Sequence, residues 1–129
     1  MLAEGQIEGQ IVKVEHKTGQ YIGKIASADG RRALVEIMAV LRHPEQGDLH
    51  SAYNPDAPIF HERRASAERE KVWVMLKDAA PFAGDVPDYR DSLAAAWQAE
   101  VRRMDRMRRW AEQCLVRLDA VGRDYGLQN

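Results

Sequence analysis

Two strands and the turn between them can be read in QYIGKIASADGRRALVEIMAVL, the stretch from Gln20 to Leu41, and they set the architecture of the chain. Asp29-Gly30 separates the two apolar halves and is typical of the tight turns in β-hairpins. The second half, Arg32 to Leu41, is a nearly continuous apolar run, which predicts a strand buried on both faces over part of its length. A helix is the alternative for this run, but the preceding turn and the β-branched residues favour a strand.

Three further short strands are expected around this hairpin. Gln10 to His16 precedes it and is joined to it by turn residues at Thr18-Gly19. Ile59 to Ala65 follows it as a possible strand, and Glu70 to Leu76 is a clearer one, with Val72, Val74 and Leu76 on one face. Gly23, within the first half of the hairpin, indicates a bulge or a bend. Five short strands with tight turns predict a small SH3-like β-barrel.

The last third of the chain has a helical pattern. Asp88 is the expected N-cap of a helix, with Asp91 in the first turn. Apolar residues then recur at spacings of three and four, which predicts one amphipathic stripe. The stripe consists of Leu93, Trp97, Val101, Met104, Met107, Ala111, Cys114, Leu118, Val121 and Tyr125.

The sequence leaves open whether this stripe lies on one helix or on two. Neither proline nor glycine interrupts the chain from Asp88 to Val121, which favours one helix. About 34 residues would span about 50 Å, far more than a small barrel can cover. A helical hairpin broken near Met104 to Arg106, with Asp105 as a second N-cap, would bury the stripe within the chain, and we expect this arrangement.

The predicted fold class is therefore α+β, with the strands first and the helices second. The barrel is expected over residues 1–80, with a long polar loop at 42–58. A linker rich in proline and glycine is expected at 81–87, and the helical segment at 88–125.

Composition limits the class of protein. The chain has 129 residues, 45% of them hydrophobic, and a formal net charge of -1, which gives no electrostatic footprint for nucleic acid. The single cysteine, Cys114, excludes an internal disulfide, and we expect it to be an apolar helix residue. Neither a signal-peptide pattern nor a lipid-bearing cysteine is visible, and no run is apolar enough to span a membrane. We expect a cytoplasmic protein without direct membrane insertion.

The candidate site is the polar stretch LRHPEQGDLHSAYNPDAPIFHERRA, from Leu41 to Ala65, which holds three of the four histidines. Its prolines and Gly47 predict a loop over much of its length, and a loop this long in a compact domain is usually functional or disordered. The histidines and an aromatic residue argue against plain disorder. The candidates for binding a partner or a ligand are His43, Gln46, Asp48, His50, Tyr53, His61, Glu62 and Arg63.

Several chemistries are open for this stretch. His43, His50 and His61 could bind a metal with Asp48 or Glu62, but the spacing matches no standard ligand motif. Hydrogen bonds from each imidazole to the loop backbone are the simpler expectation. General acid–base catalysis would use the same residue types, but neither a nucleophile motif nor a phosphate-binding glycine loop accompanies them. We therefore expect no enzyme activity, no cofactor and no metal.

Two further features have more than one interpretation. Arg63-Arg64 could bind a carboxylate on a partner, or pair with nearby acidic side chains along a strand edge. The helical stripe is expected to be mainly core packing. Part of it could instead form a homodimer seam or a docking face, with Trp97 and Trp110 as anchors.

Four segments, in order along the chain, resemble the kinase-associated protein B family of endospore-forming Firmicutes, also called kinase-associated lipoprotein B. They are KTGQYIG (Lys17 to Gly23), AVLRHPEQGDLH (Ala39 to His50), FHERRA (Phe60 to Ala65) and GDVPDYRDSL (Gly84 to Leu93). The resemblance implies an SH3-like barrel followed by α-helices. It also implies a non-catalytic accessory role in sporulation signalling, with a membrane-bound sensor histidine kinase or its phosphorelay proteins as partners.

Two hypotheses of function follow. In the first, the protein is an interaction module whose Leu41–Ala65 stretch is recognised by a partner of the kinase pathway, which could recruit the chain to the membrane. In the second, it is a small-ligand or metal-binding domain, possibly a hydrolase. The second hypothesis requires His43, His50 and His61 to converge in the fold.

Overall fold

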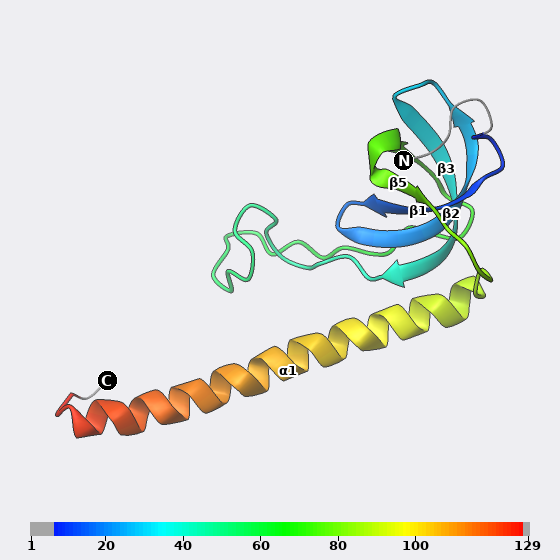
Figure 1. Ribbon diagram of the computed structural model, residues 1–129. Helices are drawn as coiled ribbons and strands as arrows, with labels where there is room; N and C mark the ends of the chain where they lie inside the picture. The colour runs from blue at the N-terminus through cyan, green and yellow to red at the C-terminus, as the bar shows by residue number, and fades with distance from the viewer. Residues whose placement is uncertain (1–6, 128–129) are drawn as a thin grey trace. The chain divides into compact units, whose positions relative to one another are not determined.

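A computed structural model describes residues 7–127 of the chain and shows an antiparallel sheet of five strands and one long helix (Figure 1). The elements are β1 (Ile11–His16), β2 (Gly19–Ala28), β3 (Arg32–Arg42), β4 (Lys71–Met75), the 3-10 turn η1 (Leu76–Asp78), β5 (Ala79–Pro81) and α1 (Tyr89–Asp124). The predicted α+β class is confirmed. The expectation that the N-terminus is not a signal peptide concerns residues 1–6 in part, and these lie outside the described residues.

Turn chemistry explains how the first three strands pair. Lys17 and Thr18 connect β1 to β2 with φ angles of 47° and 69°, and two positive values suit a two-residue hairpin turn. Between β2 and β3, the Asp29 carboxylate accepts hydrogen bonds from the backbone N–H groups of Arg31 and Arg32, at 3.2 and 2.8 Å. Gly30 has a φ of 91° in the same turn. The predicted strands on either side of both turns are confirmed.

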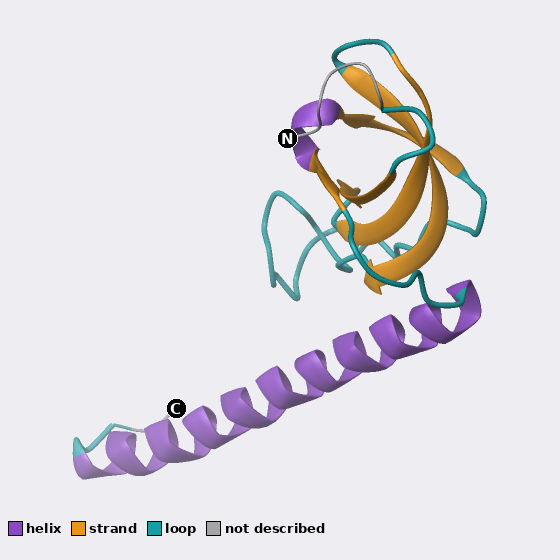
Figure 2. Cartoon of the chain, turned by 45° about the vertical axis from the view of Figure 1, so that its right-hand side comes forward, coloured by secondary structure: helices purple, strands orange, loops and turns teal. Residues whose placement is uncertain are grey.

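Pairing between β2 and β3 is interrupted at three points, where the register shifts between Gln20/Tyr21, Ile22/Gly23 and Ile25/Ser27. At Gly23 the backbone lies directly against β3. A Cβ added there would be 2.3 Å from Val35 Cγ1 and 2.8 Å from the carbonyl oxygen of Glu36. The predicted irregularity at Gly23 is confirmed, and the sheet is strongly curved (Figure 2).

The strands are arranged in the order β4-β3-β2-β1-β5. Within residues 7–127 no ladder joins β4 to β5, so the predicted closed SH3-like barrel is not confirmed. The predicted strand from Ile59 to Ala65 is wrong, because this segment forms no regular ladder. Conversely, β5 pairs with residues 12–14 of β1, although the sequence predicts no strand there. The prediction places Ala79 and Ala80 at the end of the barrel and Pro81 in the linker. Three residues ending in proline carry too little periodic signal to predict a strand.

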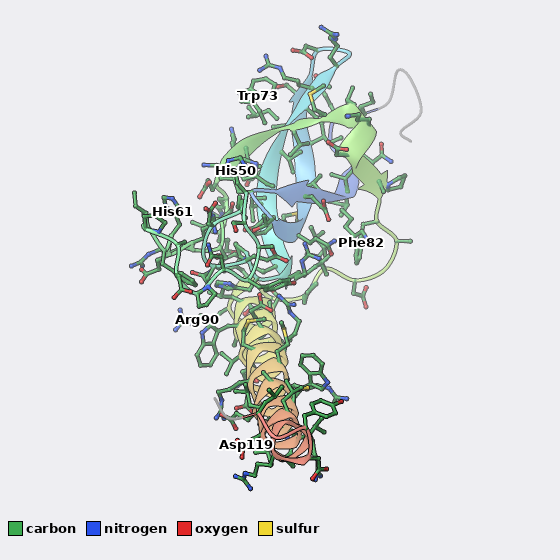
Figure 3. All side chains as sticks on the ribbon, turned by 90° about the vertical axis from the view of Figure 1, so that its left-hand side faces the viewer. His50, His61, Trp73, Phe82, Arg90 and Asp119 are labelled. Carbon is green, nitrogen blue, oxygen red and sulfur yellow. The ribbon has the colours of Figure 1, made fainter. Side chains whose placement is uncertain are left out.

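The core is a single cluster of buried apolar side chains to which all five strands contribute. Most of its large, fully buried side chains come from β1, β2 and β3, including Val12, Val14, Tyr21, Ile25, Val35 and Ile37. Along β3 buried residues alternate with half-buried ones, and only Ala39 and Val40 are buried consecutively, so burial of both faces is confined to that pair. On the outer face Trp73 is exposed (Figure 3), and the Arg32 guanidinium lies 4.4 Å from its ring centre.

The first turn of α1 is fixed to β3. The Asp88 carboxylate accepts a hydrogen bond from the backbone N–H of Asp91 at 3.1 Å, which confirms Asp88 as the N-cap. The buried hydroxyl of Ser92 accepts a hydrogen bond from the Val40 N–H at 3.0 Å and donates one to the Tyr89 carbonyl at 2.8 Å. This hydroxyl satisfies a backbone donor of β3 that would otherwise be buried without a partner.

The predicted helical hairpin is wrong, because α1 continues unbroken for 36 residues. Asp105, the expected second N-cap, lies within the helix, and its carboxylate accepts hydrogen bonds from Arg108 and Arg109 at 2.6 and 3.0 Å. Pairs at these spacings stabilise a continuous helix. No helix within residues 7–127 is sufficiently long and apolar to cross a membrane.

The chain divides into two compact units, of which the first ends at Trp97 and the second begins at Gln98. The boundary therefore lies within α1. In the second unit no side chain of residues 98–127 is buried, and Cys114 is a half-buried free thiol on α1. The assumption behind the hairpin, that the chain must bury its own apolar stripe, does not hold for this unit.

Candidate functional site

The candidate site is the loop that connects β3 to β4. Residues 43–70 contain neither a helix nor a strand, and they leave the sheet and return to it as two neighbouring arms (Figure 1). The two arms are joined by backbone, because the N–H of Gly47 donates to the carbonyl of His61 at 2.8 Å. At the end of the return arm, Arg69 and Glu70 hydrogen-bond to the backbone of Ile37 in β3. The loop is thus held at its base by the sheet.

The two arms form no β-ladder, and the side-chain amide of Gln46 hydrogen-bonds to the backbone of the opposite arm. Gln46 Oε1 accepts the N–H of Arg63 at 2.8 Å, and Gln46 Nε2 donates to the carbonyl of Arg63 at 2.9 Å. The Arg63 guanidinium donates in turn to the carbonyl of Glu45 at 2.9 Å. We call this reciprocal pair, Gln46 and Arg63, the loop clamp. Both were predicted as binding candidates, and the structure gives both a role in shaping the loop.

Three hydroxyl groups anchor the base of the loop. The N–H of Glu45 donates to Thr18 Oγ1 at 2.9 Å, next to the β1–β2 turn. The buried Ser66 is held from both sides, because its N–H donates to Tyr21 Oη at 3.0 Å and its carbonyl accepts from Tyr89 Oη at 2.6 Å. Burial raises the pKa of the Tyr89 phenol above its ordinary value, so this group remains a protonated donor.

The three histidines of the loop have different surroundings. His43 is half-buried, and its Nδ1 lies 3.0 Å from the carbonyl oxygen of Pro44. His50 and His61 are exposed on the loop (Figure 3). The backbone N–H of His50 donates to the Asp48 carboxylate at 2.9 Å, which closes a local turn. Within residues 7–127 no group of three or more His, Cys, Asp or Glu residues could hold a metal ion. The convergence that a metal site would require is not found.

The other predicted candidates lie on the loop surface. Tyr53 is exposed and has a φ of 64°, an uncommon value for a residue with a side chain. Glu62 and Arg64 are strongly exposed, with 3.9 Å between Glu62 Oε2 and Arg64 Nη2. Arg63 and Arg64 therefore differ, since the first contacts the loop backbone and the second points to solvent. Whether any of the eight candidates contacts a partner stays a prediction.

Sequence reasoning missed three exposed apolar side chains of the loop. Leu49, Ile59 and Phe60 are 46%, 67% and 59% exposed, and Tyr53 is 66% exposed. The Phe60 ring lies over Gly47, where a Cβ would be 3.1 Å from Phe60 Cζ. The sequence predicts Ile59 and Phe60 in a strand, which would bury part of their side chains. The signal in the sequence is that these large apolar residues stand in a segment rich in turn-forming residues, with Pro58 directly before Ile59. We call Leu49, Tyr53, Ile59 and Phe60 the apolar loop residues.

The loop clamp makes a testable contribution to stability. We expect Gln46→Ala to lower the free energy of unfolding by about 1 kcal/mol, because it removes the hydrogen bonds to both backbone groups of Arg63. Amide hydrogen exchange at Arg63 should also become faster, and mass spectrometry of peptic fragments measures it. Glu62→Ala is the matched control, since its side chain makes only an exposed ion pair. Equal exchange in the two variants would contradict a clamping role for Gln46.

The family follows from comparison with known proteins. Residues 16–126 match the model of the family described as "Kinase associated protein B", which covers the strands from the end of β1, the loop and α1. The chain belongs to the kinase-associated protein B family. The resemblance carried by the four sequence segments is confirmed.

Two relatives in this family cover nearly the whole chain. "Kinase-associated lipoprotein B" of Bacillus subtilis (strain 168) is 41% identical over 118 residues, which are 91% of this chain and 92% of the relative. The crystal structure of kinase-associated protein B from Bacillus cereus is 30% identical, with a TM-score of 0.65, over 93% of this chain and 97% of that one. The chain is thus similar to these proteins over both of its units.

Proposed function

We propose that this protein is a non-catalytic accessory protein of sporulation signalling, which modulates a sensor histidine kinase or its phosphorelay through protein–protein contacts. Membership of a family named for kinase association supports the link to a kinase. The resemblance noted in the sequence supports sporulation as the process. The protein acts in the cytoplasm, and the kinase recruits it to the membrane.

The apolar loop residues form the contact with the partner in this proposal, and the observation that carries it is their exposure on an anchored loop. Each of the four is between 46% and 67% exposed. The base of the same loop is held by the loop clamp and by the two tyrosine hydroxyls at Ser66. A fixed loop loses little conformational entropy on binding, and aromatic and aliphatic anchors supply much of the energy at protein interfaces. The polar candidates Asp48, His50 and His61 supply directional contacts around these anchors.

The alternative of a small-ligand or metal-binding domain, or a hydrolase, gains no support. It required His43, His50 and His61 to converge, and the described residues contain no metal-binding group of this kind. His43 Nδ1 instead lies within hydrogen-bonding distance of the backbone oxygen of its neighbour. An interaction surface accounts for the exposed apolar residues, which a catalytic site of this type would not require.

The experiment is capture of the sensor kinases from sporulating cells by the full chain, followed by binding measurements with the purified kinase. We expect the double variant Leu49→Ser/Phe60→Ser to bind at least tenfold more weakly, because two anchors are lost. The matched control is Trp73→Ser/Met75→Ser, which removes two exposed apolar residues of similar exposure from the outer face of β4.

The outcomes separate the loop from the rest of the surface. Weaker binding by the loop variant alone supports the proposal, provided that circular dichroism shows an intact fold. Equal binding by the loop variant and the unaltered chain would contradict it. A triple variant, Asp48→Ala/His50→Ala/His61→Ala, then measures how much the polar candidates contribute to kinase binding. It should weaken binding less than Leu49→Ser/Phe60→Ser does.

A further inference from the structure

The C-terminal part of α1 has an apolar seam that the chain itself does not bury. From Met104 onwards, spacings of three and four alternate strictly through Met104, Met107, Ala111, Cys114, Leu118, Val121 and Tyr125. Such alternation over three heptads is the pattern of a coiled coil. No side chain is buried between residues 98 and 127, and Leu118 and Tyr125 are 64% and 73% exposed. The seam therefore lacks the second helix that its spacing fits.

We infer that this seam binds a second copy of the same chain, as an antiparallel two-helix coiled coil. In an antiparallel coiled coil, each residue at heptad position a packs against a residue at position d of the other helix. With Ala111 opposite Cys114 of the second copy, Met107 lies opposite Leu118 and Met104 opposite Val121. The smallest side chains thus meet at the centre, where they allow close approach of the helices, and the larger ones fill the layers on either side.

Charge favours the antiparallel orientation over the parallel one. In the antiparallel register, Arg103 flanks the seam beside Asp124 of the second copy, and symmetry creates this pair twice. Trp110 likewise flanks Arg117 of the second copy, which suits a cation–π contact. In a parallel pair, Arg103 would instead lie beside Arg108 of the second copy, and like charges at these flanking positions are unfavourable.

The distribution of charge also disfavours an anionic membrane or an acidic peptide as the occupant. Four arginines of the helix already bind acidic side chains of the same helix: Arg103, Arg108, Arg109 and Arg123. Residues 98–124 carry seven arginines and five acidic residues, so the helix does not have the strongly basic polar face of a membrane-surface helix. The seam itself is apolar, which suits an equally apolar partner such as its own copy.

The first test measures self-association of the full chain by sedimentation equilibrium over a range of concentrations. We expect a reversible dimer, and we expect Leu118→Glu to raise its dissociation constant about thirtyfold, because each dimer then buries two carboxylates in the seam. Val116→Glu is the matched control, since Val116 is 60% exposed and lies on the opposite face of the helix. It should change the dissociation constant less than threefold, and circular dichroism checks that both variants keep the helix.

The second test fixes the orientation by charge reversal. Arg103→Glu should weaken the antiparallel dimer roughly fivefold by opposing Asp124 of the second copy, and adding Asp124→Arg in the same chain should restore it. In a parallel dimer, Arg103→Glu would remove a repulsion from Arg108 and strengthen association. A chain that stays monomeric up to roughly millimolar concentration, equal effects of Leu118→Glu and Val116→Glu, or a strengthened Arg103→Glu dimer would each overturn the inference.

Discussion

The variant Gly23→Ala is expected to lower the free energy of unfolding by about 3 kcal/mol, the largest effect we predict for a single methyl group. The new Cβ would lie 2.3 Å from Val35 Cγ1 and 2.8 Å from the Glu36 carbonyl oxygen. The first contact could be relieved by moving a side chain, but the second requires the backbone of β3 to shift. Val35 is fully buried, so its side chain has little space to move into. Urea denaturation followed by near-ultraviolet circular dichroism measures the loss.

Gly122→Ala is the control for this prediction. Gly122 lies on α1, where an added Cβ would be 3.6 Å from its nearest neighbour, the carbonyl oxygen of Leu127. That is an ordinary contact, and alanine favours a helix over glycine by up to about 1 kcal/mol. We expect this variant to be neutral or slightly more stable. If Gly23→Ala left the free energy of unfolding unchanged, the close contact between Gly23 and the backbone of β3 would be contradicted.

The curved sheet was largely predictable because its signals are local. Asp29-Gly30 and the flanking apolar runs predict the β2–β3 hairpin, and Gly23 predicts the register shift within β2. The N-cap at Asp88 was equally local and is confirmed. Each of these features is encoded within a few residues, where backbone preference and side-chain hydrogen bonding act directly.

The failures concern choices that depend on what surrounds a segment. The helical hairpin was inferred from the need to bury an apolar stripe, whereas the ion pairs of Asp105 with Arg108 and Arg109 favour an unbroken helix. Ile59 to Ala65 begins with two strand-forming residues, but the segment that lies beside it is the other arm of the loop. The side-chain amide of Gln46 makes the two hydrogen bonds to the backbone of Arg63 that the backbone of a neighbouring strand would otherwise make.

The loop over residues 43–58 is predicted correctly, but its internal hydrogen bonds are not visible in the sequence. The loop clamp joins residues 17 positions apart, and the bond from Ser66 to Tyr21 joins residues 45 positions apart. No local pattern encodes such pairs. For the same reason the exposure of Leu49, Ile59 and Phe60 is not predicted, since it follows from the path of the arms and not from their composition.

The variant Tyr21→Phe is expected to lower the free energy of unfolding by about 2 kcal/mol, because it leaves the buried N–H of Ser66 without an acceptor. The ring itself remains in the core, where Tyr21 is 1% exposed, so the loss comes from one oxygen atom. Tyr53→Phe removes the same atom from a residue that is 66% exposed and should change stability by less than about 0.5 kcal/mol. Thermal denaturation of the two variants, measured side by side, gives the comparison.

The effect of Tyr21→Phe should also extend to the loop, because Ser66 is where the return arm enters the core. Hydrogen exchange at Ser66 should become faster, and partner binding should weaken less than in Leu49→Ser/Phe60→Ser, since the apolar anchors remain. Tyr89→Phe removes the hydrogen bond to the carbonyl oxygen of the same residue, Ser66, which belongs to the next peptide group. The double variant should therefore lose less stability than the two single losses combined, because a Ser66 backbone that one change has already loosened has less to lose from the other. Strictly additive losses would show that the two hydroxyls act independently, and that Ser66 does not work as one shared anchor of the loop.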